Sequence, residues 1–172
     1  VYVVYPLIEE SENMDFKDLT DGYESIVREF PQPQYQIGVL NGRMKASDKE
    51  YEMQKFKEGK TQIMVSTTVI EVGVDVPNAS LMVIESAERF GLSQLHQLRG
   101  RVGRGAEQSF CVLMTGYKLG QEARTRMETM VRTNDGFEIA EVDMRLRGPG
   151  DIQGTQQSGQ PLFKISNLSK DG

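Results

Sequence analysis

The segment of this sequence best suited to chemistry is residues 97–105, where arginines and glycines alternate closely. It reads Gln97-Leu98-Arg99-Gly100-Arg101-Val102-Gly103-Arg104-Gly105. Glycine lets the backbone approach an anion, and a guanidinium can grip two phosphate oxygens at once. Residues 89–105 hold four arginines and no acidic residue, although the whole chain has a net charge of −5. The pattern predicts a phosphate-binding segment, and the alternative is a solvated basic turn.

Two further segments stand where a site loop would be expected, directly after an apolar run. Residues 67–77 follow the run Gln62–Ser66, and Asn41-Gly42-Arg43-Met44 follows Tyr35–Leu40. Backbone amides and a guanidinium at such a position can meet a phosphate group. Taken alone, Asp75 is more typical of a turn. Arg43 is as well explained by a surface salt bridge.

Three other features attract chemical interpretations that the residues do not support. Gly59-Lys60-Thr61 looks like the end of a phosphate-binding P-loop, but Gln54 stands where that loop needs another glycine, so we predict a helix end and a turn. His96 is the only histidine and has no ligand at metal-binding spacing, so we expect a structural, hydrogen-bonding role and predict no metal site. Cys111 lies in an apolar run and is interpreted as a small core residue.

Short apolar runs alternate with helical patterns along residues 1–117. We predict strands at 1–5, 35–40, 62–66, 81–85 and 110–115, and helices at 16–30 and 47–58. Ser47 and Glu50 match a capping box at the start of the second helix, and Gly59 would cap its end. The later strands lack clean alternation, as expected when both faces are covered. The rhythm predicts an α/β fold, a parallel sheet with helices on both faces, whose ligands gather at the carboxyl ends of the strands.

A different pattern begins after this α/β region. Residues 121–131 and 136–145 have helical spacing, and Gly148–Gly159 is rich in glycine and polar residues. We predict a C-terminal helical hairpin and an ordered loop over residues 118–172, packed as a second unit on the lobe formed by 1–117. A flexible linker is the alternative for the loop.

Composition limits the class of protein. The 172 residues suit one domain with a small appendage, and no apolar run is long enough to cross a membrane. Residues 1–5 lack the basic leader of a signal peptide. The single Cys111 fits a reducing compartment, so we expect a cytoplasmic protein.

The glycine and arginine segment resembles motif VI of superfamily 2 helicases, and residues 67–77 resemble their motif V. The resemblance implies a RecA-like fold, specifically the second helicase lobe. It makes Arg101 and Arg104 the arginine fingers that reach the γ-phosphate of ATP, with Gln97 in the nucleotide-sensing network. Four further positions follow from motif V: Gly73 and Asp75 near the nucleotide, and Thr67 and Thr68 on nucleic-acid phosphates.

Within that superfamily the sequence is similar to the RecG family. Residues 41–44 resemble its His-Gly-Arg-Met element, with Asn41 in place of histidine, and this assigns Arg43 to DNA. Residues 134–150 resemble the translocation motif shared by RecG and the transcription-repair coupling factor Mfd, which implies coupling roles for Arg147 and Gln157. Pro149 favours RecG, because Mfd usually has Arg-Gly-Ala-Gly there.

The resemblance implies a motor lobe of an ATP-dependent DNA helicase that remodels branched or duplex DNA, including stalled forks and Holliday junctions, in recombination and repair. ATP and Mg²⁺ would be held mainly by a first RecA-like lobe, and a wedge domain would complete a monomeric enzyme. This fragment alone is then expected to be inactive. Two alternatives stay open at this point: the motor lobe of Mfd, and a non-catalytic nucleic-acid interaction module.

Overall fold

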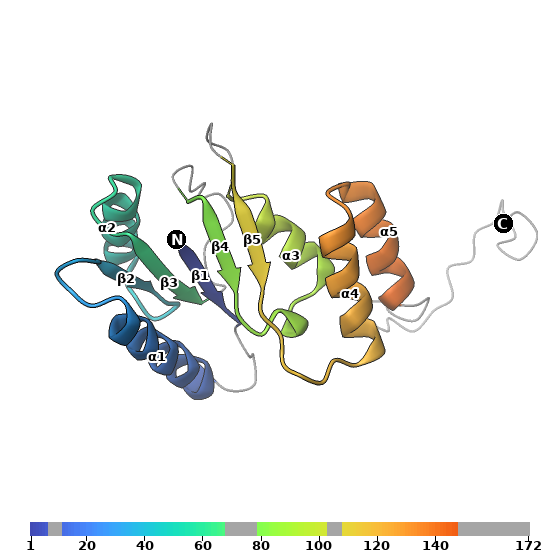
Figure 1. Cartoon of the computed structure of the whole chain (residues 1–172), viewed down its shortest axis with the longest axis horizontal. Coiled ribbons are helices and arrows are strands. Elements are labelled where there is room, and N and C mark those ends of the chain that lie inside the picture. The colour runs from blue at the N-terminus through green and yellow to red at the C-terminus, as the bar shows by residue number, and fades with distance from the viewer. Residues whose placement is uncertain (7–11, 68–78, 103–107, 148–172) are drawn as a thin grey trace, which may run out of the picture.

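The computed structural model describes residues 1–6, 12–67, 79–102 and 108–147. Its strands form one sheet in the order β2-β3-β1-β4-β5, and every neighbouring pair is parallel (Figure 1). The strands are β1 (Tyr2–Tyr5), β2 (Ile37–Leu40), β3 (Ile63–Thr67), β4 (Leu81–Ile84) and β5 (Phe110–Leu113). The predicted parallel α/β sheet is confirmed.

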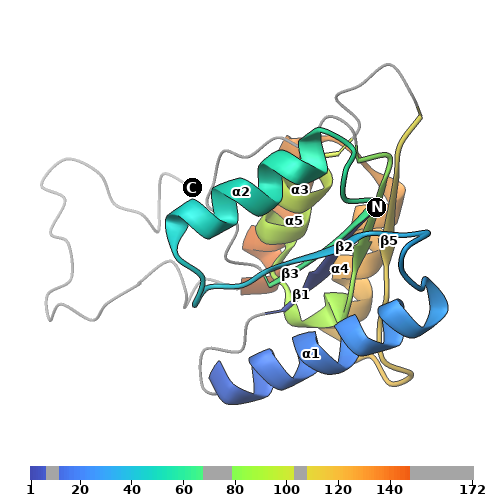
Figure 2. The same ribbon diagram turned by 90° about the vertical axis from the view of Figure 1, so that its left-hand side faces the viewer.

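Helices cover both faces of this sheet. They are α1 (Glu12–Glu29), α2 (Ala46–Lys57), the short 3-10 helix η1 (Ala87–Arg89), α3 (Leu92–Arg99), α4 (Gln121–Arg132) and α5 (Gly136–Arg147). In Figure 2, α1 lies on one side of the sheet and α2 and α3 lie on the other. The α4–α5 hairpin packs against α3, with α4 also touching η1. Within the described ranges no helix has the length and apolar character needed to span a membrane.

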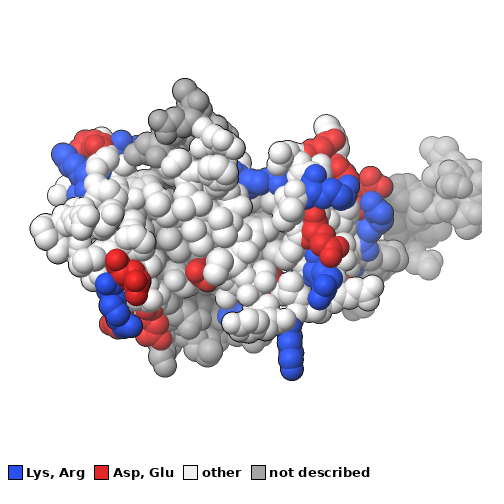
Figure 3. All heavy atoms as spheres, in the orientation of Figure 1, with Lys and Arg blue, Asp and Glu red and all other residues white. Residues whose placement is uncertain are grey.

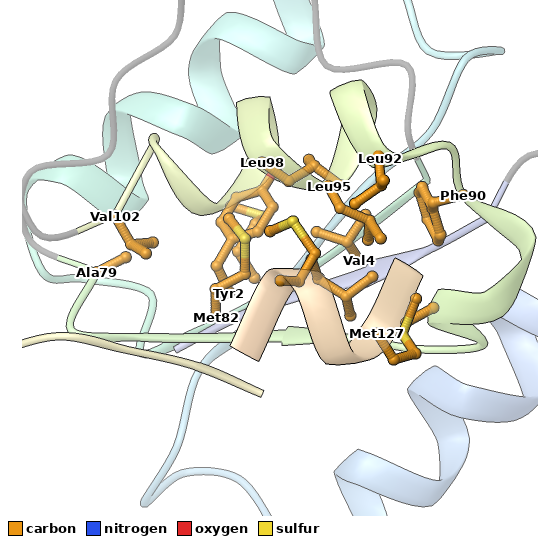
Figure 4. Close-up of a cluster of buried hydrophobic side chains, with 14 of the residues drawn as sticks. Tyr2, Val4, Ala79, Met82, Phe90, Leu92, Leu95, Leu98, Val102 and Met127 are labelled. Atoms are coloured by element: carbon orange, nitrogen blue, oxygen red, sulfur yellow. The ribbon is translucent and has the colours of Figure 1, made fainter. Parts of the chain in front are cut away.

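The face that carries α2 and α3 holds the larger hydrophobic core, which we call the major core (Figure 4). Leu92 and Leu95 of α3 are 0% exposed and pack over Val4 of β1. Met127 of α4 and Ile139 of α5 belong to the same cluster. Burying each such side chain contributes roughly 1.5–3 kcal/mol. The hairpin therefore shares one core with the sheet.

A smaller cluster, the minor core, lies under α1 on the opposite face. Val3 of β1 and Val65 of β3 point to this side and meet Leu19 of α1. Successive side chains of a strand alternate between faces, which is why Val3 belongs to the minor core while Val4 belongs to the major one.

The prediction that β5 is covered on both faces is wrong. Phe110 is 56% exposed and Val112 is 40% exposed on the side of the sheet that α1 occupies. β5 is an edge strand, and the strands in closest contact with α1 are β1 and β3, so β5 lies outside the main area covered by this helix. Figure 3 shows a mostly uncharged area there, whereas charged side chains gather over the hairpin.

The predicted capping box at Ser47 is also wrong. The N-cap residue of α2 is Lys45, two residues before Ser47, and it makes no side-chain cap bond. The carbonyl of Lys45 accepts from the amides of Asp48 and Lys49, so Ser47 already lies in the first turn, and its hydroxyl donates to Asp48 Oδ1 at 3.3 Å. The other end is as predicted: Gly59 follows the helix with φ of +72°, a conformation that favours glycine.

Candidate nucleotide and DNA site

Arg101 is held at the end of α3 by main-chain bonds. The amide of Gly100 donates to the carbonyl of His96, and the amide of Arg101 donates to that of Leu98, each at 3.0 Å. Leu98 before it and Val102 after it are both buried. The Arg101 side chain is half-buried. Its backbone is therefore fixed by α3 and by two apolar anchors.

Arg101 lies toward the amino ends of the strands. Helix α3 starts beyond the end of β4 and leads back to the start of β5, which is parallel to β4, so its own end lies at the opposite edge. Val102 packs near Ala79, which precedes β4 (Figure 4). Burial raises the pKa of the Tyr2 phenol, and the positive charge of Arg101 acts in the opposite direction. That influence places Arg101 close to the first residue of β1.

The residues predicted to contact DNA lie at the other edge of the sheet. Thr67 is the last residue of β3, and Arg43 follows the end of the adjacent strand β2. The amide of Arg43 donates to Asn41 Oδ1 at 3.0 Å, so Asn41 supports the turn that presents this exposed arginine. Thr67 is 4% exposed, and its Oγ1 has no hydrogen-bond partner among the described residues.

These positions correct one expectation. The sequence predicts a single gathering of ligand-binding residues at the carboxyl ends of the strands. Arg43 and Thr67 lie there, but Arg101 does not, because α3 carries it back to the opposite edge. The candidate nucleotide residue and the candidate DNA residues are therefore separated by the length of the sheet.

The hairpin is bonded to the α3 side of the fold at two separate points. Arg126 of α4 donates from Nη2 to the carbonyl of Glu88 in η1 at 2.8 Å. Arg99 of α3 donates from Nη1 to the carbonyls of Met130 and Thr133 at 2.7 and 2.9 Å. Arg147, at the end of α5, pairs with Asp143 at 2.8 Å along its own helix.

His96 and Cys111 have the structural roles expected of them. His96 Nδ1 lies 3.2 Å from Arg99 Nη2. A guanidinium can only donate, so the imidazole nitrogen accepts. Cys111 is half-buried in β5, and burial raises the pKa of its thiol, which disfavours the reactive thiolate.

A family model described as the helicase conserved C-terminal domain matches residues 9–106. This chain belongs to that helicase family. A second model, described as domain 3 of the ATP-dependent DNA helicase RecG, C-terminal part, matches residues 133–172. The second match covers the hairpin helix α5 and the residues beyond it.

Relatives of this helicase domain are RecG proteins. The chain is 54% identical to the ATP-dependent DNA helicase RecG of Synechocystis, over 99% of this chain and 20% of the relative. Its identity to the Bacillus subtilis RecG is 49%, over 99% of this chain and 25% of the relative. The chain thus spans about a fifth to a quarter of their length. The resemblance to RecG is confirmed, and these matches favour RecG over Mfd.

Solved helicase structures agree with this assignment. The structure of RecG bound to a three-way DNA junction superposes with a TM-score of 0.70 at 47% identity, covering 88% of this chain and 19% of that chain. The helicase MrfA bound to DNA and AMPPNP gives 0.56 at 18% identity, covering 77% of this chain and 18% of that chain. The latter likeness concerns the fold alone. Together they confirm the RecA-like second-lobe fold.

The structure describes half of the ten predicted site residues. Those it describes are Gln97, Arg101, Arg43, Thr67 and Arg147. Those outside the described residues are Arg104, Gly73, Asp75, Thr68 and Gln157. Gln97 is exposed on α3, next to the buried Leu98.

Two arginines with long-range bonds, Arg99 and Arg126, were missed by sequence reasoning. Both donate to main-chain carbonyls more than thirty residues away. Every residue has a carbonyl, so the acceptor leaves no mark in the sequence. The only local signal is the position of Arg99 in the last turn of α3, three residues after His96.

Proposed function

We propose that this chain is the C-terminal motor lobe of an ATP-dependent DNA helicase that remodels branched DNA, such as stalled forks and Holliday junctions, in recombination and repair. The observation that carries the proposal is the position of Arg101 at the end of a helix that is bonded to the hairpin. The names of the relatives, and a RecG structure described as bound to a three-way DNA junction, support the same activity.

In this proposal Arg101 and Arg104 bind the γ-phosphate of ATP held by a first RecA-like lobe, with Gln97, Gly73 and Asp75 close to the nucleotide. ATP hydrolysis supplies the free energy for movement along DNA. A guanidinium suits this position because it stays charged and neutralises negative charge on the transferred phosphoryl group. We assign Mg²⁺ to the first lobe, together with the ATP that it accompanies.

DNA is assigned to the opposite edge of the sheet. Arg43, Thr67 and Thr68 would contact its phosphates. Residues 118–172 would form the translocation unit on the lobe of 1–117, with Arg147 and Gln157 coupling lobe movement to duplex movement. We propose that the full-length protein acts in the cytoplasm as a monomer with a first lobe and a wedge domain.

The finger assignment is tested by the ATPase activity of the full-length protein. We expect Arg101→Ala or Arg104→Ala to lower DNA-stimulated ATP hydrolysis by about 10³-fold or more, because arginine fingers contribute roughly 10³–10⁵ in rate. DNA affinity should change little. Arg28→Ala, on the exposed side of α1, is the matched control. Near-normal ATPase in Arg101→Ala, or ATP turnover by the isolated 172 residues, would contradict the proposal.

The coupling assignment is tested by fork unwinding measured together with ATPase. We expect Arg147→Ala in the full-length protein to lose unwinding while ATP hydrolysis persists. If neither activity changes, the coupling role of Arg147 is wrong.

A further inference from the structure

We infer that Arg99 is a positioning residue that ties α3 to both helices of the hairpin, so that a displacement of the α3 end reaches α4 and α5. The inference rests on the proposed function and deepens it, because it names the side chain that links the nucleotide segment to the translocation unit.

Arg99 first binds the C-terminal end of α4 through two hydrogen bonds, which we call the Arg99 clamp. Arg99 Nη1 donates to the carbonyl of Met130 at 2.7 Å and to that of Thr133 at 2.9 Å. Met130 lies in the last turn of α4, and Thr133 is its C-cap residue. Carbonyls at a helix end have no partner within the helix and carry its partial negative charge. A guanidinium is therefore the fitting donor, and its hydrogen bonds are charge-assisted.

Arg99 then reaches the start of α5 through His96. Arg99 Nη2 holds His96 Nδ1 at 3.2 Å. On its other side the imidazole lies against Gly136, the first residue of α5, where an added Cβ would stand 3.2 Å from Nε2. One turn of α3 thus touches the end of α4 and the beginning of α5.

Arg99 is also adjacent to the proposed finger. Only Gly100 separates it from Arg101, and the amides of both following residues are bonded back into α3. Arg101 influences Tyr2 on the sheet, whereas Arg99 is bonded to the hairpin. A shift of this helix end must therefore move both arginines together. Burial lowers the pKa of Arg99, and a hydrogen bond is electrostatically stronger where water is partly excluded.

The hairpin has other attachments that should keep it folded when Arg99 is changed. Four hairpin side chains remain in the major core: Met127, Met130, Ile139 and Val142. The bond from Arg126 to Glu88 lies at a different point of α4. We therefore expect that loss of the Arg99 hydrogen bonds weakens the coupling between α3 and the hairpin, while the hairpin stays packed on the lobe.

The experiment measures base pairs unwound per ATP hydrolysed by the full-length protein on a forked DNA. Arg99→Met keeps an unbranched side chain but removes every donor. We expect it to lower the ratio about tenfold, within the roughly 5- to 150-fold range of couplings between sites, while ATPase stays within about twofold of wild type. Arg99→Lys keeps a cationic donor that can serve both carbonyls and should restore at least about half of the wild-type ratio. Arg28→Ala should match wild type.

Several outcomes would overturn the inference. A parallel fall of ATPase and unwinding in Arg99→Met would mean that Arg99 acts in catalysis or in folding. An unchanged number of base pairs unwound per ATP would mean that the Arg99 hydrogen bonds do not couple α3 to the hairpin. If Arg99→Met does not fold, Arg99→Lys decides, and a ratio about tenfold below wild type in that folded variant would defeat the inference. A wild-type protein without DNA-dependent ATPase would instead defeat the proposed function itself.

Discussion

On one face of the sheet, α1 is the helix of the described ranges that packs on β1 and β3, and Phe110 and Val112 of β5 stay exposed. On the other face, α3 lies between the sheet and the α4–α5 hairpin, and all three helices share the major core. Close-packed interiors transmit strain rather than absorb it. A shift of α3 is therefore expected to reach the hairpin, whereas α1 packs on the opposite face of the sheet. The enclosed face is therefore the side of the sheet on which a displacement of a helix can reach the hairpin.

The two faces should differ most in their response to the loss of a buried leucine side chain. Leu95 is 0% exposed between the sheet and the hairpin, and Leu19 is 1% exposed under α1. Leu→Ala in a core costs roughly 2.7–5 kcal/mol, depending on how far the site can collapse. We expect Leu95→Ala to cost about 4–5 kcal/mol of unfolding free energy, because it is enclosed on both sides. Leu19→Ala should cost about 3 kcal/mol, because its neighbours are freer to relax.

Urea denaturation followed by circular dichroism measures both changes. Equal losses for Leu95→Ala and Leu19→Ala would break the contrast between an enclosed and an open face.

The same substitution, valine to threonine, should have different effects at a buried position of β3 and at an exposed position of β5. Val65→Thr places a hydroxyl in β3 at a position that is 0% exposed, and an unpaired buried hydroxyl costs about 1–3 kcal/mol. Val112→Thr places it on the exposed face of β5, where we expect a change within about 0.5 kcal/mol. Thermal denaturation of the two variants tests this. A large loss for Val112→Thr would show that the β5 face is covered after all.

The smallest expected effect concerns the surface of the hairpin. The Thr133 hydroxyl and the Arg132 guanidinium lower the pKa of Glu138, which is partly exposed. A lowered pKa means that the carboxylate stabilises the fold above its ordinary pKa of about 4.3 and that this contribution is lost as the pH falls through the folded value. Glu138→Gln should therefore lower the melting temperature slightly at pH 7, and this difference should shrink as the pH falls below the ordinary pKa.

Glu128→Gln, an exposed change on α4, is the control for that measurement. A difference between Glu138→Gln and wild type that is as large at pH 3 as at pH 7 would rule out the ionic origin.

The sequence predicts most of the elements because their signals are local. Apolar runs mark the strands, helical spacing marks α4 and α5, and Gly59 marks the end of α2. The N-cap of α2 was misplaced by two residues, at Ser47 instead of Lys45, since the cap is decided by which carbonyl takes the first bond. The exposure of Val112 depends on which helices reach β5, and no local pattern contains that information.

The site was predictable only in part for a similar reason. The motif containing Arg101 is contiguous in the sequence, so its chemistry can be inferred from nine residues. Its place at the amino ends of the strands follows from the direction of α3 between β4 and β5. The Arg99 clamp depends on carbonyls of Met130 and Thr133, which any residue would supply. Such contacts become visible only in three dimensions.

The strand order has a consequence for synthesis on the ribosome. The central strand β1 pairs with β3 and β4. The register partners of Tyr2 are Met64 and Met82, which lie 62 and 80 residues later in the chain. At roughly 5–20 residues per second, the last of these partners emerges about 4–16 s after Tyr2. Until β3 emerges the central strand has no strand partner, and until β4 emerges one of its two edges stays open. Nascent chains of this lobe should therefore depend on chaperones that shield β1 until β4 arrives.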